Sequence, residues 1–172
     1  EYIENPIEIF SSGIKYCKSI EKAFAQDKLK MMISLDSACR ETYKRIKQVD
    51  CFDKVVENLK NYISASENAK KNLTLKYIIV DNVNDNETEI TNFINLVKDL
   101  GIQNVRMDFD FEKYKYERNI IIPKKYYDLY DLYDKKAEEA GLTIRRYEQI
   151  EDILDKFSST YNIDYKKKEI VY

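Results

Sequence analysis

Histidine is absent from this chain of 172 residues. Its absence excludes Ser-His-Asp and Cys-His catalysis and every metal site that needs an imidazole ligand. Any catalytic acid or base must therefore be Asp, Glu, Lys, Tyr or Cys.

Cysteine is scarce, and Cys17, Cys39 and Cys51 form no Cys-x2-Cys pair. This spacing excludes a zinc knuckle and a ferredoxin-type cluster run. Cys17 and Cys51 lie in helical patterns, and Cys39 follows a predicted strand. We expect all three to be buried, reduced thiols, which is the usual state of free cysteine.

Long apolar runs are also missing, since no stretch approaches the roughly 18 residues of a transmembrane span and no signal peptide opens the chain. The 29 Lys and Arg residues nearly balance the 31 Asp and Glu residues, which argues against nucleic-acid or membrane partners. We expect one soluble, cytoplasmic domain with a real core. The chain starts at Glu1 rather than Met, as a piece of a longer protein would.

The most informative stretch that is present runs from Lys30 to Ser37, where apolar residues stop at a Ser-x-Asp sequence. A short apolar run bounded by polar residues is typical of a strand buried on both faces of a parallel sheet. Ligands bind at the carboxyl ends of such strands. The polar residues Ser34 and Asp36 therefore mark a candidate site.

The rest of the chain repeats this unit, with alternating strand and helix patterns. Strands are predicted at 6–10, 29–35, 73–80, 102–111 and 142–144. Helices are predicted at 15–26, 41–64 with a break at 48–50, 89–100, 126–140 and 148–157. Asp50 is the expected N-cap after the break, and Gly101 and Gly141 end two helices. The alternation predicts an α/β fold with a parallel sheet of about four to five strands and flanking helices, either part of a TIM-like (β/α) barrel or a small open sheet.

Two patterns near the end of the chain allow more than one interpretation. Asp108 and Asp110 would share one face of a strand and could bind a cation or transfer protons. An edge strand with one solvated face explains their alternation more simply. Four tyrosines could stack on bases, but adjacent aspartates would repel phosphates, so amphipathic packing is the preferred interpretation. They are Tyr126, Tyr127, Tyr130 and Tyr133.

Several runs, taken in order, resemble the middle of radical S-adenosylmethionine (radical SAM) enzymes. The chain has Ser11-Ser12-Gly13 where that superfamily has a Thr-Asn-Gly-like turn after its third barrel strand, and Ser34-Leu35-Asp36 after the fourth. The helix that follows carries the family pattern Phe-x-x-Val-x-x-Asn-Leu. It is matched by Phe52, Val55, Asn58 and Leu59. Residues 77–80 running into 83–87 resemble the fifth strand and its Val-Asn-Asp, and the similarity continues through Leu100-Gly101-Ile102 into a sixth strand, covering roughly residues 5–112.

The resemblance implies site residues. Ser34 would contact the carboxylate end of S-adenosylmethionine and Asp36 the neighbouring ribose, with Ser11 or Ser12 nearby. Asn82 or Asn84 would lie beside the adenosine. Hydroxyl and amide groups suit ribose and carboxylate partners because they add no fixed charge to a cleft. Without a ligand role, Ser34 and Asp36 would form a strand-end turn in which Asp36 caps the following helix.

The chain also departs from the family pattern. It has no Cys-x3-Cys-x2-Cys loop to hold an iron-sulfur cluster and no Gly-Gly-Glu, since its only glycines, Gly13, Gly101 and Gly141, lie far apart. We therefore expect residues 1–112 to be strands three to six of a partial barrel, and 113–172 an insertion and helical extension of the same domain.

The resulting hypothesis is a fragment of a radical SAM protein, inactive alone, whose missing N-terminal part would supply a 4Fe-4S cluster. The parent would be an enzyme that uses S-adenosylmethionine and cleaves it reductively. No cofactor is expected on this chain by itself. A truncated barrel would leave a strand edge uncovered, so we expect self-association. The alternative is a non-catalytic α/β binding or interaction domain; a weaker third hypothesis is a metal-dependent hydrolase or transferase using Asp108 and Asp110.

Overall fold

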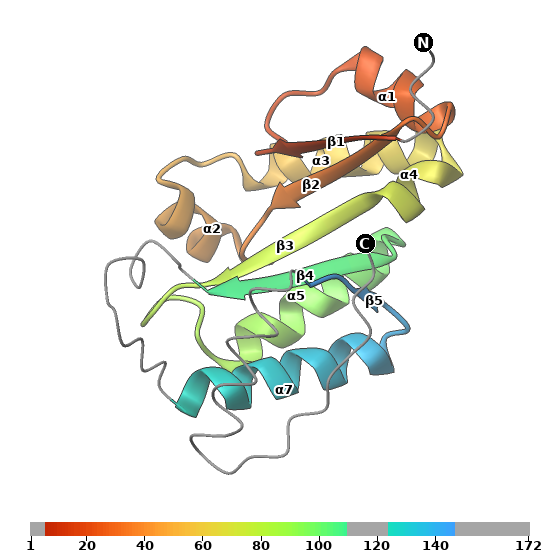
Figure 1. Ribbon diagram of the computed structural model, residues 1–172. Helices are drawn as coiled ribbons and strands as arrows, with labels where there is room; N and C mark the ends of the chain where they lie inside the picture. The colour runs from red at the N-terminus through yellow and green to blue at the C-terminus, as the bar shows by residue number, and fades with distance from the viewer. Residues whose placement is uncertain (1–5, 110–123, 147–172) are drawn as a thin grey trace, which may run out of the picture.

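The computed structural model describes residues 6–109 and 124–146, which form a five-stranded parallel sheet with helices packed against it (Figure 1). The strands lie in the order β1-β2-β3-β4-β5, so each strand pairs with the one before it in the chain. This confirms the predicted α/β class with a parallel sheet and flanking helices.

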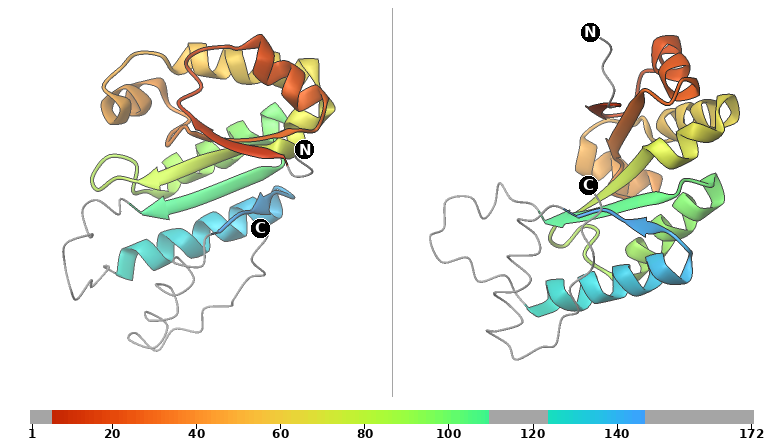
Figure 2. Two further views of the ribbon diagram at one scale, coloured as in Figure 1. Left: turned by 45° about the horizontal axis from the view of Figure 1, so that its top comes forward. Right: turned by 45° about the vertical axis from the view of Figure 1, so that its right-hand side comes forward.

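The helices connect successive strands on one face of the sheet. Right-handed crossovers between strands that always advance in the same direction place every connecting helix on the same side. Helices α1 (Lys18–Ala25), α3 (Phe52–Ala65), α5 (Glu87–Leu100) and α7 (Lys124–Glu139) accordingly lie together on that side (Figure 2). This winding is that of a barrel sector, whereas a doubly wound sheet reverses direction and covers both faces.

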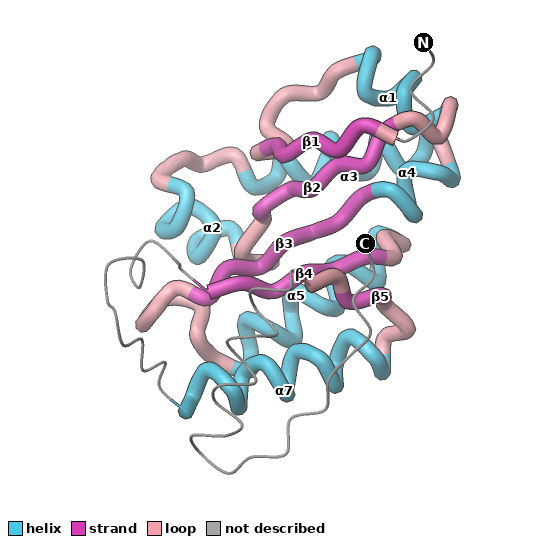
Figure 3. Tube along the Cα trace, in the orientation of Figure 1, coloured by secondary structure: helices cyan, strands magenta, loops and turns pink. Residues whose placement is uncertain are grey.

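The remaining elements complete the alternation (Figure 3). The strands are β1 (Ile7–Ser11), β2 (Leu29–Ser34), β3 (Leu73–Ile79), β4 (Asn104–Phe109) and β5 (Thr143–Ile144). The other helices are α2 (Arg40–Lys47) and α4 (Glu67–Asn72). The predicted break between two helices is confirmed, because Gln48 takes a left-handed conformation with φ 59° at the end of α2.

The core lies between the helices and one face of the sheet. The strand residues in it alternate along each strand, as side chains on a pleated sheet must. They are Leu29, Met31, Ile33 and Leu35; Leu73, Leu75, Tyr77 and Ile79; and Val105, Met107 and Phe109. The four tyrosines of α7 are buried in the same cluster, so their predicted role in amphipathic packing is confirmed.

Three local predictions were wrong. Helix α4 was not predicted, because its six residues are mostly polar and only Ala69 is buried. Asp50 is not the N-cap of α3: Cys51 holds that position, and Asp50 forms an ion pair with Arg40. The thiols are free but not buried, since Cys17 is exposed and the other two are partly exposed. All three cysteines occupy helix N-cap positions, where the chain leaves a loop and lies near the surface.

The edge-strand interpretation of β4 was also wrong. All six residues of β4 are buried, and β5 pairs with its outer side. Its period-two pattern arises because one face meets the helices while the other buries Arg106 and Asp108 as an ion pair. The alternation of apolar and charged residues in β4 therefore distinguishes an apolar buried face from a charged buried face, and not a buried face from an exposed one.

Some predictions fall on residues outside the described ranges. They include Asp110, most of the predicted insertion after residue 112 and the predicted helix at 148–157. The described part of the extension joins the same sheet, because β5 follows α7 and pairs with β4. Within the described ranges, no helix combines the length and apolarity that a bilayer span requires.

Candidate ligand-binding site

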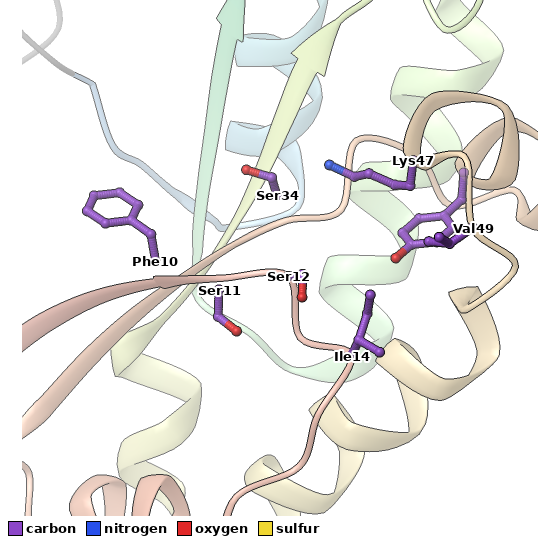
Figure 4. Close-up of a pocket in the computed structure, with 8 residues that line it drawn as sticks. Phe10, Ser11, Ser12, Ile14, Ser34, Lys47 and Val49 are labelled. Atoms are coloured by element: carbon purple, nitrogen blue, oxygen red, sulfur yellow. The ribbon is translucent and has the colours of Figure 1, made fainter.

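A pocket of about 550 Å³ opens at the carboxyl ends of β1 and β2, beside the end of α2 (Figure 4). Three serines and one lysine supply its polar lining, and the remaining side chains are apolar or aromatic. The lining residues are Phe10, Ser11, Ser12, Ile14, Ser34, Tyr43, Lys47 and Val49. The pocket lies at the edge of the sheet where parallel α/β folds bind ligands.

Ser11 and Ser12 enter the pocket on a turn that α3 holds in place. Gly13 has φ 73°, and a Cβ built there would lie 3.0 Å from Val55 Cγ1, so the turn packs directly on the helix. Asn58 Nδ2 donates hydrogen bonds to the carbonyl oxygens of Gly13 and Ile14, at 2.8 and 2.9 Å. Two residues of the Phe-x-x-Val-x-x-Asn-Leu pattern, Val55 and Asn58, therefore hold the turn after β1 against α3.

Ser34 is the last residue of β2 and faces the pocket from the neighbouring strand. The pairing of Ser11 with Ile33 brings the next residues, Ser12 and Ser34, to the same level of adjacent strands. Lys47 reaches this region from α2, with its ammonium directed toward Ser34 (Figure 4). The pocket therefore gathers hydroxyl groups around one cation.

Asp36 is buried, with only 1% of its surface exposed, and lies behind the pocket. Its Oδ1 accepts a hydrogen bond of 2.9 Å from the backbone N–H of Ile78, and its Oδ2 pairs with Lys47 Nζ. Burial raises the pKa of the Asp36 carboxyl, and the Lys47 ammonium opposes that rise. Asp36 therefore joins the ends of β2 and β3 and fixes the position of Lys47.

The alternative interpretation, in which Asp36 would cap the next helix, was wrong. Cys39 is the N-cap residue of α2, without a side-chain hydrogen bond. Ser37 forms the turn in its place, because Ser37 Oγ accepts a hydrogen bond of 2.9 Å from the Cys39 N–H. Asp36 takes a left-handed conformation with φ 63°, which turns its carboxylate toward β3 and away from α2.

Asn82 and Asn84 occupy different environments. Asn84 is fully buried and donates to the carbonyl oxygens of Asp36 and Ile78, at 2.7 and 2.9 Å, while its Oδ1 accepts from the Val80 N–H at 2.7 Å. Its amide thus holds the turn after β3 against the turn after β2. Asn82 is exposed at φ 57° on that turn and does not line the pocket.

The structure therefore brings three of the six predicted residues, Ser11, Ser12 and Ser34, into one pocket. Asp36 reaches that pocket only through Lys47, and Asn84 only through the backbone of Asp36. Sequence reasoning missed Lys47 and the aromatic residues Phe10 and Tyr43. Nothing in the sequence distinguishes Lys47 from the other basic residues of α2, because its importance comes from a partner on another element.

Asp108, the candidate for a cation site, is engaged by basic side chains. Arg106 Nε donates to Asp108 Oδ1 at 2.9 Å, and Arg106 Nη2 lies 2.8 Å from Oδ2. Across residues 6–109 and 124–146, no group of three or more Cys, Asp or Glu side chains could hold a metal ion.

No family model matches the chain, and no curated protein matches it. Among solved structures, it is similar to a radical SAM methyltransferase from Sphaerobacter thermophilus, with a TM-score of 0.53 and 13% sequence identity. The chain shares the fold of part of that enzyme. The match covers 80% of this chain and 39% of the methyltransferase, so this chain spans well under half of that protein's length. At this identity the likeness concerns the fold alone.

Proposed function

We propose that this chain is part of the partial barrel of a radical SAM protein and that its pocket contacts S-adenosylmethionine. The observation that carries the proposal is the set of three serines gathered at the carboxyl edge of a singly wound sheet. The fold shared with part of a radical SAM methyltransferase and the order of the sequence runs support it.

The residues of the pocket fit the chemistry of S-adenosylmethionine. Serine hydroxyls both donate and accept hydrogen bonds, as ribose hydroxyls and a carboxylate require, and the Lys47 ammonium complements a carboxylate. Phe10, Ile14 and Tyr43 supply apolar surface for a purine. The cavity volume of about 550 Å³ lies within the usual range of small-molecule sites.

The roles carried over from the resemblance change at two positions. The polar side-chain atoms of Asp36 and Asn84 already bind backbone groups, and Asp36 also pairs with Lys47. We assign them to positioning: Asp36 orients Lys47, and Asn84 fixes the turn after β3. Ser12 and Ser34 remain the candidates for direct contact.

The described residues do not fit an iron-sulfur cluster. The three cysteines occupy the N-cap positions of three different helices, and they belong to no group of three ligands among residues 6–109 and 124–146. In this proposal the cluster, and the reductive chemistry that it supplies to radical SAM enzymes, belong to another part of the parent protein. This chain alone is then catalytically silent and holds the cofactor only weakly.

Weak contact can be measured by following backbone amide shifts in NMR spectra while S-adenosylhomocysteine, a stable analogue, is added. We expect shifts at Ser12, Gly13 and Ser34 and none around Ser64, which lies on the distal part of α3. Ser34→Leu should abolish the shifts, because its side chain fills the pocket without a hydroxyl. The matched control, Ser64→Ala, should leave them unchanged. Shifts confined to other regions, or none at saturation, would overturn the proposal.

A second candidate function is a non-catalytic α/β binding domain. The observation that favours it is the use of Asp36 and Asn84 as purely structural groups. The reading frame upstream of Glu1 discriminates the two, since a Cys-x3-Cys-x2-Cys loop there supports the radical SAM proposal. A complete frame without that loop supports the binding domain.

A further inference from the structure

Lys47 is the one cationic side chain among the residues that line the pocket. Its side chain is 26% exposed, and its ammonium is directed toward Ser34 (Figure 4). Within residues 6–109 and 124–146, its only carboxylate partner is Asp36 Oδ2. An ammonium has three donors, so the contact with Asp36 leaves donors that a ligand in the pocket can use.

Two serine hydroxyls beside Lys47 are available in the same way. Ser11 Oγ already accepts a hydrogen bond of 3.1 Å from the Gly13 N–H. In the described part of the chain, the hydroxyls of Ser12 and Ser34 form no hydrogen bond with another residue. Hydroxyl and ammonium groups both donate to negatively charged oxygen atoms. This end of the pocket is therefore suited to an anionic oxygen group.

The rest of the lining is suited to an apolar part of the same ligand. Phe10 and Val49 line the pocket although they are 63% and 41% exposed. Ile14 and Tyr43 add further apolar surface. Exposed apolar side chains that gather around a pocket are typical of a binding surface. The lining as a whole thus matches a ligand that combines an anionic group with an apolar or aromatic part.

Asp36 opposes such a ligand when its carboxylate is ionised. Its side chain is only 2% exposed and lies against the Lys47 ammonium. Two like charges repel each other strongly where burial excludes the solvent that screens them. With Asp36 ionised, the pair formed with Lys47 has no net charge. With Asp36 protonated, the pair carries one positive charge, so the pocket attracts an anion more strongly.

The groups around Asp36 leave it as the one that changes charge in acid. Those that face it and can carry charge are Lys47 and Tyr43 of α2 and Lys76 and Tyr77 of β3. The turn after β3 presents Asn84, an uncharged amide. Lysines stay charged and tyrosines stay neutral throughout the acidic range. Burial raises the pKa of Asp36 above its ordinary value of about 3.9.

We propose that the pocket binds its ligand through an anionic oxygen group held by Lys47 and Ser34, and that Asp36 takes up a proton from solvent as this group enters. The proton stays on the Asp36 carboxyl while the ligand is bound, and no covalent bond forms. The inference rests on the proposed function for the place of the ligand, and it adds the acidic group and the coupled proton. Affinity for the anion then falls as pH rises through the pKa of Asp36.

Two probes of the same shape separate charge from fit. Benzenesulfonate keeps one negative charge across the acidic and neutral range, whereas benzenesulfonamide is neutral there. Affinities are measured from the amide shifts of Ser12 and Ser34 at constant ionic strength. We expect the affinity for the sulfonate to fall about tenfold from the acidic limit to the plateau at higher pH, which corresponds to a coupling of one pKa unit. The affinity for the sulfonamide should not change with pH.

Asp36→Asn should bind the sulfonate equally well at every pH, with the affinity that the unaltered chain shows in acid. Lys47→Met should bind the sulfonate no better than the sulfonamide. The matched controls are Asp50→Asn and Lys44→Met, which break an exposed ion pair that does not line the pocket. Both controls should keep the pH profile of the unaltered chain. Thermal unfolding, followed by circular dichroism, establishes that each variant is folded.

Calorimetry of the unaltered chain tests the proton directly, and it does not depend on whether Asp36→Asn folds. The heat of sulfonate binding is measured near the midpoint of the pH profile in two buffers of different ionisation enthalpy. We expect the two heats to differ in the direction of proton uptake by the complex. Equal heats would overturn the inference.

Other results would overturn it as well: no shifts at Ser12 and Ser34, an affinity independent of pH, or a pH dependence that persists in Asp36→Asn. An affinity that rises with pH would mean that Asp36 serves only to orient Lys47. S-adenosylhomocysteine separates this inference from the proposed function. If the sulfonate binds with proton uptake and the analogue does not bind, the proposed function fails and this inference stands. If the analogue binds and neither ligand depends on Asp36, the reverse holds.

Discussion

At the scale of single residues, Asp36 shows how a side chain predicted to touch a ligand came to serve the fold. It is buried at a left-handed backbone position and divides its two oxygens between Ile78 and Lys47. The ammonium of Lys47, which lines the pocket, is therefore held in position by Asp36. A buried carboxylate of this kind makes stability depend on pH.

The pH dependence has a definite sign. Because burial raises the pKa of Asp36 in the folded chain, the folded state binds a proton more readily than the unfolded state, where the pKa is about 3.9. Ionisation of Asp36 then costs stability as pH rises from that value through the raised pKa. We expect the unaltered chain to lose stability relative to Asp36→Asn over this window and to show a constant difference above it.

Urea unfolding of both proteins across the acidic range measures this difference. Ser64→Ala provides a control at an exposed site, where the pH profile should match that of the unaltered chain. If the unaltered chain instead gains stability relative to Asp36→Asn as pH rises, the attraction of Lys47 outweighs burial.

At the scale of elements, the turn after β1 depends on α3. Val55 and Asn58 lie one helical turn apart on α3. Val55 packs against Gly13, and Asn58 donates a hydrogen bond to the Gly13 carbonyl oxygen. The helix therefore sets the position of Ser11 and Ser12 in the pocket. A side chain at Gly13 would push the turn away from the helix.

Gly13→Ala tests this contact, and Gly141→Ala is its matched control. Both glycines have nearly the same positive φ, 73° and 72°, but a Cβ at Gly141 meets nothing within 4 Å. Both variants carry the cost of a left-handed conformation, whereas only Gly13→Ala also crowds Val55 and Ile33. We expect Gly13→Ala to lower the free energy of unfolding by about 1–3 kcal/mol more than the control, as overpacking does. Equal losses in urea unfolding would mean that the turn relaxes freely.

At the scale of the whole molecule, the sheet is an arc with an outer strand. Within the described residues β1 pairs only with β2, and its Ile7 and Phe10 are 53% and 63% exposed. Strand edges with apolar side chains promote pairing with another chain. The expected self-association through this edge remains a prediction.

Sedimentation at several concentrations tests it. We expect the mean mass of the unaltered chain to rise with concentration and Ile7→Lys to suppress the rise, because a charge on an edge strand opposes pairing. Val49→Lys changes an exposed apolar residue away from the edge and should have no such effect. A strictly monomeric chain would contradict the prediction.

The sequence alone predicted most of the elements and the end of the sheet at which polar residues gather. The spacing of apolar residues along the chain determines these features locally. The apolar run before Ser34 specifies a buried strand, and the spacing of Ile90, Phe93 and Val97 specifies an amphipathic helix. It could not specify α4, which has almost no apolar pattern, or the burial of Asp108, whose carboxylate pairs with Arg106 and with Lys76 of the neighbouring strand.

What the sequence determined by itself is therefore the succession of β-α units, since each unit's periodicity and turn residues are encoded within a few neighbouring positions. Only the tertiary structure decided which polar residues bind each other and which remain accessible. Asp36 accepts a hydrogen bond from the backbone of Ile78, and Lys76 pairs with Asp108 of the neighbouring strand, contacts that span more than thirty positions of chain. Such contacts depend on how distant strands pair, and no local pattern of residues records that pairing.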